Sequence, residues 1–295
     1  MQEVTKYYHG SKKPAVEKLS LVINPGEVYG FLGSNGAGKS TTIRLLMDFL
    51  RPTSGSIRFF GSETDAHVTN VRAHIGYLPG DVSLPKKVTG RELLTHLATL
   101  QGSAFDTQYY KELTERFEAQ LDKRTDTLSK GNWQKIGLIQ AFMHKPRLLI
   151  LDEPTSGLDP LMQEQFYICI NEAKQRGAAI FLSSHSLGEV EKICDRIGII
   201  KEGCLVYEGL IAEVIKNRKP TWSIRLEKIS DIALLKNSPH FTILRETKNE
   251  VIVQPTLPLT KALGELSKLS VVAMDIQHAD LEDEFMHYYE TRKQS

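Results

Sequence analysis

One nine-residue segment constrains the fold of this chain more than any other. It fits the pattern G-x-x-x-x-G-K-[ST] of loops that wrap nucleotide phosphates, and reads Gly33-Ser34-Asn35-Gly36-Ala37-Gly38-Lys39-Ser40-Thr41. An apolar stretch of strand length, residues 28–32, precedes it, and apolar residues recur at helical spacing after it, over residues 42–49. The motif needs this strand–loop–helix context. The pattern therefore predicts a phosphate-binding loop in an α/β fold rather than a chance match.

The residue types explain why such a loop binds phosphate. Glycines allow the tight turn, the backbone N–H groups point inward, and the N-terminus of the following helix adds partial positive charge. We expect Lys39 to reach the β- and γ-phosphates and the Ser40 hydroxyl to bind Mg²⁺. The loop therefore indicates a nucleotide triphosphate together with Mg²⁺.

Polar side chains follow two later apolar strands. Asp152 and Glu153 come directly after the apolar run 148–151, which is typical of a central parallel strand. Open α/β sheets bind ligands at the carboxyl ends of such strands, so we expect Asp152 to position Mg²⁺ and Glu153 to act as general base. The alternative for Glu153 is an ordinary charge at a strand end. His185 follows the apolar run 178–182 at the same edge, where a neutral imidazole would contact a γ-phosphate or its water, although most single histidines are structural.

Other segments have local signals. Residues 85–145 are largely helical in pattern, with capping-box spacing between Thr89 and Glu92, and predict a helical subdomain. Asp159 followed by proline is typical of a helix N-cap. Tyr7 and Tyr8 would either stack on an adenine ring or simply pack, and the residues alone leave both alternatives open.

A second domain is expected after a basic, proline-ended linker at residues 216–220. Residues 221–295 show the order strand, helix, strand, strand, helix, strand, with a closing helix at 280–289. This is the split order of ferredoxin-like folds, and no residue set there looks catalytic. We therefore expect a nucleotide-binding domain over residues 1–215 and a small α+β accessory domain over residues 221–295.

Composition limits the partners and the location. The net charge of the 295-residue chain is +1, which gives no electrostatic argument for binding nucleic acid. No apolar run approaches about 18 residues and the first twenty residues carry charges throughout, so we expect no transmembrane helix, no signal peptide and an intracellular chain. The three cysteines are widely spaced, which indicates buried, reduced thiols rather than a metal site.

Taken together, these motifs resemble those of the nucleotide-binding subunit of an ABC transporter, over roughly residues 2–215. The resemblance identifies residues 33–40 as Walker A, residues 148–152 as Walker B with Glu153 as catalytic acid, residues 156–159 as the D-loop and His185 as the switch histidine. It also implies ATP as the nucleotide and Tyr8 as the adenine-stacking aromatic. Residues 128–132 stand at the family's signature, whose Ser129 and Gly131 are implied to contact the γ-phosphate bound by a second copy. The segment ending at residue 285 is similar to the accessory domain of bacitracin-export-like subunits.

The chain departs from the family's pattern at two places. The signature reads S-K-G-N where the family has S-G-G-Q, so Lys130 and Asn132 differ. The family's loop glutamine, which binds Mg²⁺ and couples to the membrane partner, should fall near Gly80, and glycine has no ligand atom. Asp81 is the candidate substitute because a carboxylate suits Mg²⁺.

The function implied by the resemblance is an ATPase subunit that drives export through a separate membrane permease. Such a subunit works as a head-to-tail dimer with itself or a homologous subunit, at the cytoplasmic face of the cell membrane. One alternative is a soluble ABC ATPase acting on ribosomes or DNA, whose usual second cassette or long coiled coil this sequence lacks. Another is a nucleotide-dependent regulator that does not hydrolyse, against which Glu153 argues. The transported substrate is not encoded here, because selectivity lies in the permease.

Overall fold

The chain forms two compact units, residues 1–212 and residues 213–295. The computed structural model describes residues 1–63, 71–83, 85–101, 106–217, 220–256 and 258–278. The larger unit carries the predicted phosphate loop, and each unit has a hydrophobic core of its own.

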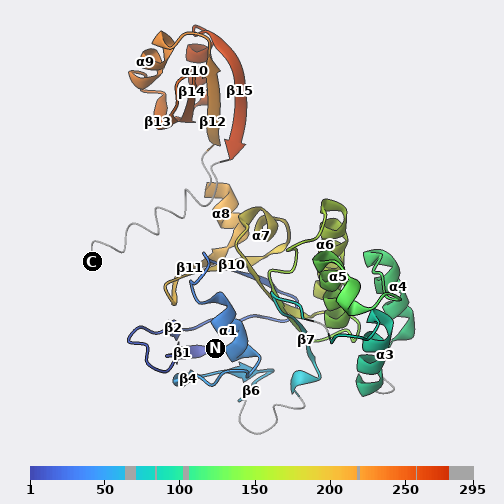
Figure 1. Ribbon diagram of the computed structural model, residues 1–295. Helices are drawn as coiled ribbons and strands as arrows, with labels where there is room; N and C mark the ends of the chain where they lie inside the picture. Colours follow the sequence, from blue (N-terminus) through green and yellow to red (C-terminus); the bar gives the residue numbers. More distant parts are fainter. Residues whose placement is uncertain (64–70, 84, 102–105, 218–219, 257, 279–295) are drawn as a thin grey trace. The chain divides into compact units, whose positions relative to one another are not determined.

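A six-stranded sheet in the order β11-β10-β3-β9-β8-β7 forms the centre of the larger unit (Figure 1). Its five parallel strands are β3 (Val28–Leu32), β7 (Ile75–Leu78), β8 (Leu148–Asp152), β9 (Ala179–Ser184) and β10 (Arg196–Lys201). Strand β11 (Cys204–Leu210) is antiparallel to β10 at the edge. Every residue of β3 and β8 is buried, as expected for continuous apolar runs in the middle of a parallel sheet. The predicted α/β fold is confirmed.

Different elements cover the two faces of this sheet. Tyr29, Phe31 and Phe181 on one face share a core with the small antiparallel sheet β2-β1-β4 and with helix α1 (Lys39–Leu46). Gly30 points to the other face, where a Cβ atom would lie 2.8 Å from a methyl group of Val190 in helix α7 (Leu187–Ile193). The close approach of α7 therefore requires a residue without a side chain.

The small sheet consists of β1 (Gln2–Lys6), β2 (Val16–Leu19) and β4 (Ser54–Ser56), and a hairpin of β5 (Arg58–Phe59) and β6 (Ser62–Glu63) follows it. The sequence predicts a single strand over residues 57–61. That prediction is wrong, because Phe60 and Gly61 have positive φ angles of 50° and 86° and turn the chain directly after β5.

Helices α3 (Gly90–Gln101), α4 (Thr107–Phe117) and α5 (Lys130–Phe142) make up the helical segment, with a short 3₁₀ turn, η2 (Thr125–Thr127), before α5. The predicted capping box is formed. The Thr89 N–H donates to Glu92 Oε2 at 2.7 Å, and the Glu92 N–H donates to Thr89 Oγ1 at 3.1 Å. Helix α6 (Pro160–Gln175) also begins as predicted, with Asp159 Oδ1 accepting from the Met162 N–H at 2.9 Å.

The smaller unit contains an antiparallel sheet in the order β13-β14-β12-β15, with helices α9 (Ser230–Lys236) and α10 (Leu259–Leu266). Its strands are β12 (Pro220–Leu226), β13 (Phe241–Glu246), β14 (Glu250–Pro255) and β15 (Val271–His278). The order of the elements along the chain, strand-helix-strand-strand-helix-strand, combined with this order in the sheet, is the split β-α-β arrangement of ferredoxin-like folds. Helix α8 (Ile211–Asn217) runs into the stretch expected to be a linker. The expected closing helix at 280–289 lies outside the described residues.

None of the described helices is long and apolar enough to cross a bilayer.

Candidate active site

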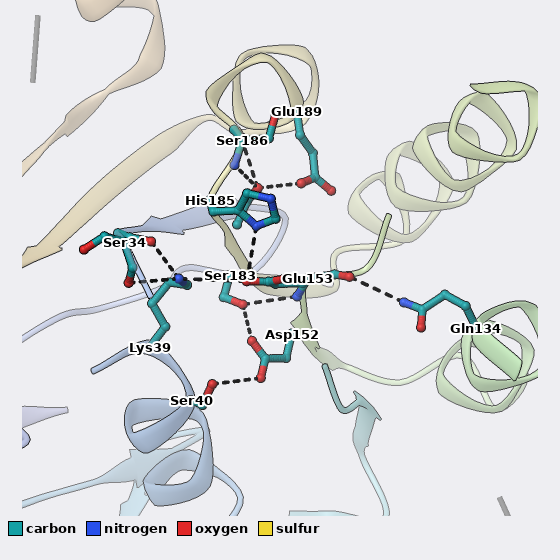
Figure 2. A network of polar contacts seen from close by, with 12 residues as sticks. Ser34, Lys39, Ser40, Gln134, Asp152, Glu153, Ser183, His185, Ser186 and Glu189 are labelled. Atoms are coloured by element: carbon teal, nitrogen blue, oxygen red, sulfur yellow. Dashed lines mark hydrogen bonds and ion pairs between the residues drawn. The ribbon is translucent and has the colours of Figure 1, made fainter. Parts of the chain in front are cut away.

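The carboxyl ends of β3, β9 and β8 bring together segments that are far apart in the sequence. These three strands are parallel neighbours, and Asp152 pairs with Ser183 in the sheet while Leu32 pairs with Ser184. The phosphate loop after β3, the acids at the end of β8 and His185 after β9 therefore meet at one edge (Figure 2). This is the edge at which open parallel sheets bind ligands.

The phosphate loop packs so closely that two of its positions admit only glycine. A Cβ atom at Gly33 would lie 2.6 Å from the carbonyl oxygen of Ile200, and one at Gly38 would lie 2.7 Å from that of Ala15. Gly38 also has a φ of 116°, a conformation that other residues rarely adopt. Between these contacts, residues 34–36 are exposed, so their peptide groups are accessible to a ligand.

Lys39 lies inside this loop and is only 6 % exposed. Its ammonium group donates to the carbonyl oxygen of Gly33 at 2.6 Å and to that of Ser34 at 3.3 Å, and it lies 3.9 Å from Glu153 Oε1. Burial lowers the pKa of Lys39, and the carboxylates of Glu153 and Asp152 oppose that shift. A cation held in this way can interact with phosphate oxygens that enter the loop.

Asp152 and Ser40 bring a carboxylate and a hydroxyl oxygen together beside the phosphate loop. The Ser40 hydroxyl donates to Asp152 Oδ2 at 3.4 Å, and the buried Ser183 hydroxyl donates to Asp152 Oδ1. Gly80 lies against the same carboxylate, because a Cβ atom there would be 3.1 Å from Asp152 Oδ2. One hydroxyl and one carboxylate fit Mg²⁺ when phosphate and water supply its other ligands. Across the described residues, no three His, Cys, Asp or Glu side chains gather into a metal-binding group.

Glu153 and His185 face each other beside this cluster. His185 Nδ1 lies 3.3 Å from Glu153 Oε1, and the two side chains are 64 % and 28 % exposed, respectively. The Glu153 N–H donates to both the hydroxyl and the carbonyl oxygen of Ser183, each at 3.2 Å. The acid is therefore fixed by its backbone while its side chain remains accessible to solvent, as a general base acting on water requires.

Comparison with known proteins gives the family. Residues 16–156 match the family model described as ABC transporter. The Bacillus subtilis protein YhaQ, an uncharacterised ABC transporter ATP-binding protein, is 37 % identical over 259 residues, which cover 86 % of this chain and 85 % of that protein. The chain belongs to the family of ABC transporter ATP-binding proteins.

Two further similarities agree with this assignment. The bacitracin transport ATP-binding protein BcrA of Bacillus licheniformis is 34 % identical over 298 residues, covering 96 % of this chain and 94 % of that protein. A solved structure described as an ATP binding subunit of an ABC transporter is 30 % identical, with a TM-score of 0.67, over 73 % of this chain and 90 % of that one. They support an ABC transporter ATPase subunit over a ribosome-acting or DNA-acting protein and over a regulator that does not hydrolyse.

Tyr8 lies beside the phosphate loop of this ABC ATPase. Its hydroxyl is 3.2 Å from Thr41 Oγ1, and its side chain is exposed. Tyr7 is equally exposed, but its backbone N–H is bound to Thr53 Oγ1 at 3.0 Å and its side chain makes no described contact with the loop. Of the two tyrosines, Tyr8 is the one whose side chain contacts the phosphate loop.

The signature residues do not complete the site of their own chain. Ser129 is exposed at the start of α5, where its Oγ accepts from the Asn132 N–H at 3.3 Å. Neither Ser129 nor Gly131 hydrogen-bonds the phosphate loop in the described part of the chain. The Asn132 side chain is buried and accepts from the Gln120 N–H at 2.9 Å, so one departure from the family's pattern has a structural role.

Asp159 and Asp81 make no described contact with Lys39, Ser40, Asp152, Glu153 or His185. The Asp159 side chain caps α6. Asp81 is exposed and faces a pocket of about 290 Å³, together with Leu128, Lys130 and Trp133 beside the signature helix.

Three polar residues of this ATPase's site were missed by the sequence reasoning. The Ser183 hydroxyl binds the Asp152 carboxylate and the Glu153 N–H, and Gln134 reaches the loop after β8 from helix α5. The buried Glu189 accepts from the Ser184 hydroxyl at 2.6 Å. Burial raises the pKa of Glu189. Of the three, Ser183 had a usable signal, because it directly follows the apolar run 178–182, as Asp152 follows the apolar run 148–151.

Proposed function

We propose that this ATPase hydrolyses ATP with Mg²⁺ in a head-to-tail dimer, and that dimer closure drives export through a separate membrane permease. The observation that carries the proposal is the convergence of Lys39, Asp152 and Glu153 on one sheet edge, while Ser129 is exposed and makes no hydrogen bond there.

The first half of the site would bind the nucleotide. Lys39 and the exposed peptide groups of residues 34–36 hold the phosphates, and the exposed ring of Tyr8 stacks on the adenine. Ser40 and Asp152 hold Mg²⁺, with Asp81 as a further candidate oxygen ligand. The ion, when bound, neutralises charge that develops on the transferred phosphoryl group.

Glu153 is the general base in this proposal. The oxygen of a water molecule bonds to the γ-phosphorus, the bond from that phosphorus to the bridging oxygen of ADP breaks, and Glu153 takes the proton. His185, whose Nδ1 lies 3.3 Å from Glu153 Oε1, orients that carboxylate and holds the γ-phosphate. The base, the histidine and the lysine lie close enough together to act on one phosphoryl group.

The second half of the site would come from another copy or a homologous subunit. Ser129 and the N-terminus of the thirteen-residue helix α5 are exposed and suit an anionic γ-phosphate. Asp159 is exposed in the loop between Glu153 and α6, where it would face the partner across the same nucleotide. Since each nucleotide then contacts both copies, ATP would favour the closed dimer and hydrolysis would release it.

The export role is proposed from the relatives. The bacitracin transport protein matches 96 % of this chain, a stretch that reaches into the smaller unit as well as the ATPase unit. We infer that this subunit attaches to a permease at the cytoplasmic face of the membrane, and that the permease selects the substrate.

Glu153→Gln tests the proposal because it keeps the shape of the base and removes its ability to accept a proton. We expect the variant to bind ATP, to lose hydrolysis and to accumulate as an ATP-dependent dimer, measured by gel filtration with light scattering. Glu164→Gln is the matched control, since the described contact of Glu164 is an exposed ion pair with Lys192, and the change should leave hydrolysis unchanged. A Glu153→Gln protein that stays monomeric with ATP would contradict the dimer mechanism.

A further inference from the structure

The backbone of the proposed base has a conformation that side-chain-bearing residues rarely adopt. Glu153 has a φ of 48°, in the left-handed region. Such conformations persist only where the surroundings hold them, and they cluster at functional sites. The question is therefore which groups hold Glu153 in place.

Four hydrogen bonds hold the two peptide groups that flank Glu153. On one side, its N–H donates to the hydroxyl and carbonyl oxygens of Ser183. On the other side, its carbonyl oxygen accepts from the Ser156 N–H at 3.1 Å and from Gln134 Nε2 at 3.4 Å. Ser183 belongs to the neighbouring strand β9 and Ser156 to the same loop, whereas Gln134 reaches across to the loop from helix α5 (Figure 2).

Gln134 is built into this position. Its side chain is buried, and Nε2 also donates to the carbonyl oxygen of Pro154 at 2.9 Å. Both amide hydrogens therefore have carbonyl partners in consecutive residues of the loop. A second close contact supports the first, because a Cβ atom at Gly131 would lie 2.8 Å from the carbonyl oxygen of Gly157. The first two turns of α5 are thus fitted against the loop that follows β8.

We propose that Gln134 is a positioning residue for the base, which fastens the backbone of Glu153 and Pro154 to the helix that begins at the signature. The inference rests on the proposed function, in which Glu153 serves the chain's own ATP and Ser129 serves the ATP of the second copy. Ser129 caps the helix that carries Gln134. Docking of the first turn of this helix on the ATP of the second copy therefore sets the conformation of Glu153 at the chain's own ATP. Gln134 itself contacts neither nucleotide.

Gln134→Leu tests this inference, since leucine has a similar size and no donor. We expect kcat for ATP hydrolysis to fall about tenfold, as for a small misplacement of a catalytic group, with KM for ATP within about twofold of the original. Gln134→His should restore much of the rate, because its Nε2–H can donate from nearly the same place. Gln140→Leu, the same change two turns later in α5, is the control and should leave kcat unchanged.

A double-mutant cycle separates positioning from general damage. If Gln134 acts through Glu153, Gln134→Leu should lower the residual single-turnover rate of Glu153→Ala by less than about twofold, because the group it positions is already gone. A tenfold loss in that background as well, or an undiminished kcat in Gln134→Leu alone, would overturn the inference. Glu153→Gln with Gln134→Leu should still form the ATP-dependent dimer. Failure of the dimer in Glu153→Gln alone would instead count against the proposed function.

Discussion

Ser183→Ala tests how the two acids of Walker B are held. The Ser183 hydroxyl is fully buried, donates to Asp152 Oδ1 and accepts from the Glu153 N–H at 3.2 Å. Alanine removes both hydrogen bonds without adding bulk. Among the described residues, the Asp152 carboxylate then keeps the long contact from the Ser40 hydroxyl, at 3.4 Å.

The size of the effect follows from the two bonds. A hydrogen bond to a charged group contributes about 1.5–3 kcal/mol to the free energy of unfolding, and a neutral one about 1 kcal/mol. The neutral bond is partly replaced, because the Glu153 N–H keeps the carbonyl oxygen of Ser183. We therefore expect Ser183→Ala to lower the free energy of unfolding by about 2–3 kcal/mol and Tm by about 4–12 °C for a unit of this size. The loosened carboxylate should lower kcat for ATP hydrolysis about 10- to 100-fold.

Ser223→Ala is the matched control for this experiment. Ser223 is also buried and donates from its hydroxyl to a carboxylate, that of Glu250, but it lies in the smaller unit. Both variants should lose stability in calorimetry, and only Ser183→Ala should lose activity in a steady-state ATPase assay. The reasoning would be refuted if Ser183→Ala hydrolysed ATP within about twofold of the original rate, or if Ser223→Ala lost as much activity.

Two further substitutions test other contacts at the site. Gly80→Ala places a Cβ atom 3.1 Å from Asp152 Oδ2. We expect the Mg²⁺ concentration that gives half-maximal hydrolysis to rise about three- to tenfold, because the carboxylate must shift. An unchanged magnesium titration would show that Asp152 adapts without loss of metal affinity. Tyr8→Ala removes an exposed ring beside the phosphate loop, and since stacking on a base contributes about 1–3 kcal/mol we expect KM for ATP to rise about tenfold. Tyr7→Ala is the control, and an equal rise in KM in that variant would exclude a specific role for Tyr8.

Parts of the site could be predicted because their signals are local. Gly33 to Ser40 are consecutive residues of one loop and the start of the next helix, so the spacing of the glycines and the lysine is enough to predict the phosphate loop. Asp152 and Glu153 follow an uninterrupted apolar strand, and Asp159 precedes a proline at the first turn of a helix. In each case the sequence signal itself lies in residues a few positions apart: the glycine spacing of the loop, the apolar run before the two acids, and the Asp-Pro pair that begins a helix.

One prediction failed, and some residues of the site could not be predicted, because no local sequence pattern shows the backbone turn or the packing that places them. The strand expected at residues 57–61 is interrupted by the positive φ of Phe60, which an apolar β-type pattern conceals. No local pattern marks Glu189, whose carboxylate is buried by packing and accepts from the Ser184 hydroxyl.

The sequence by itself determined the phosphate loop, the buried parallel strands and the residue types that follow them. Only the tertiary structure decided which of those residues meet. The Ser183 hydroxyl reaches Asp152 across 31 residues of sequence, and Gln134 reaches Pro154 across 20. Such contacts depend on strand register and on where a helix packs against the sheet edge. A shift of one residue in either would turn the side chain away from its partner, and no local pattern of residues records that alignment.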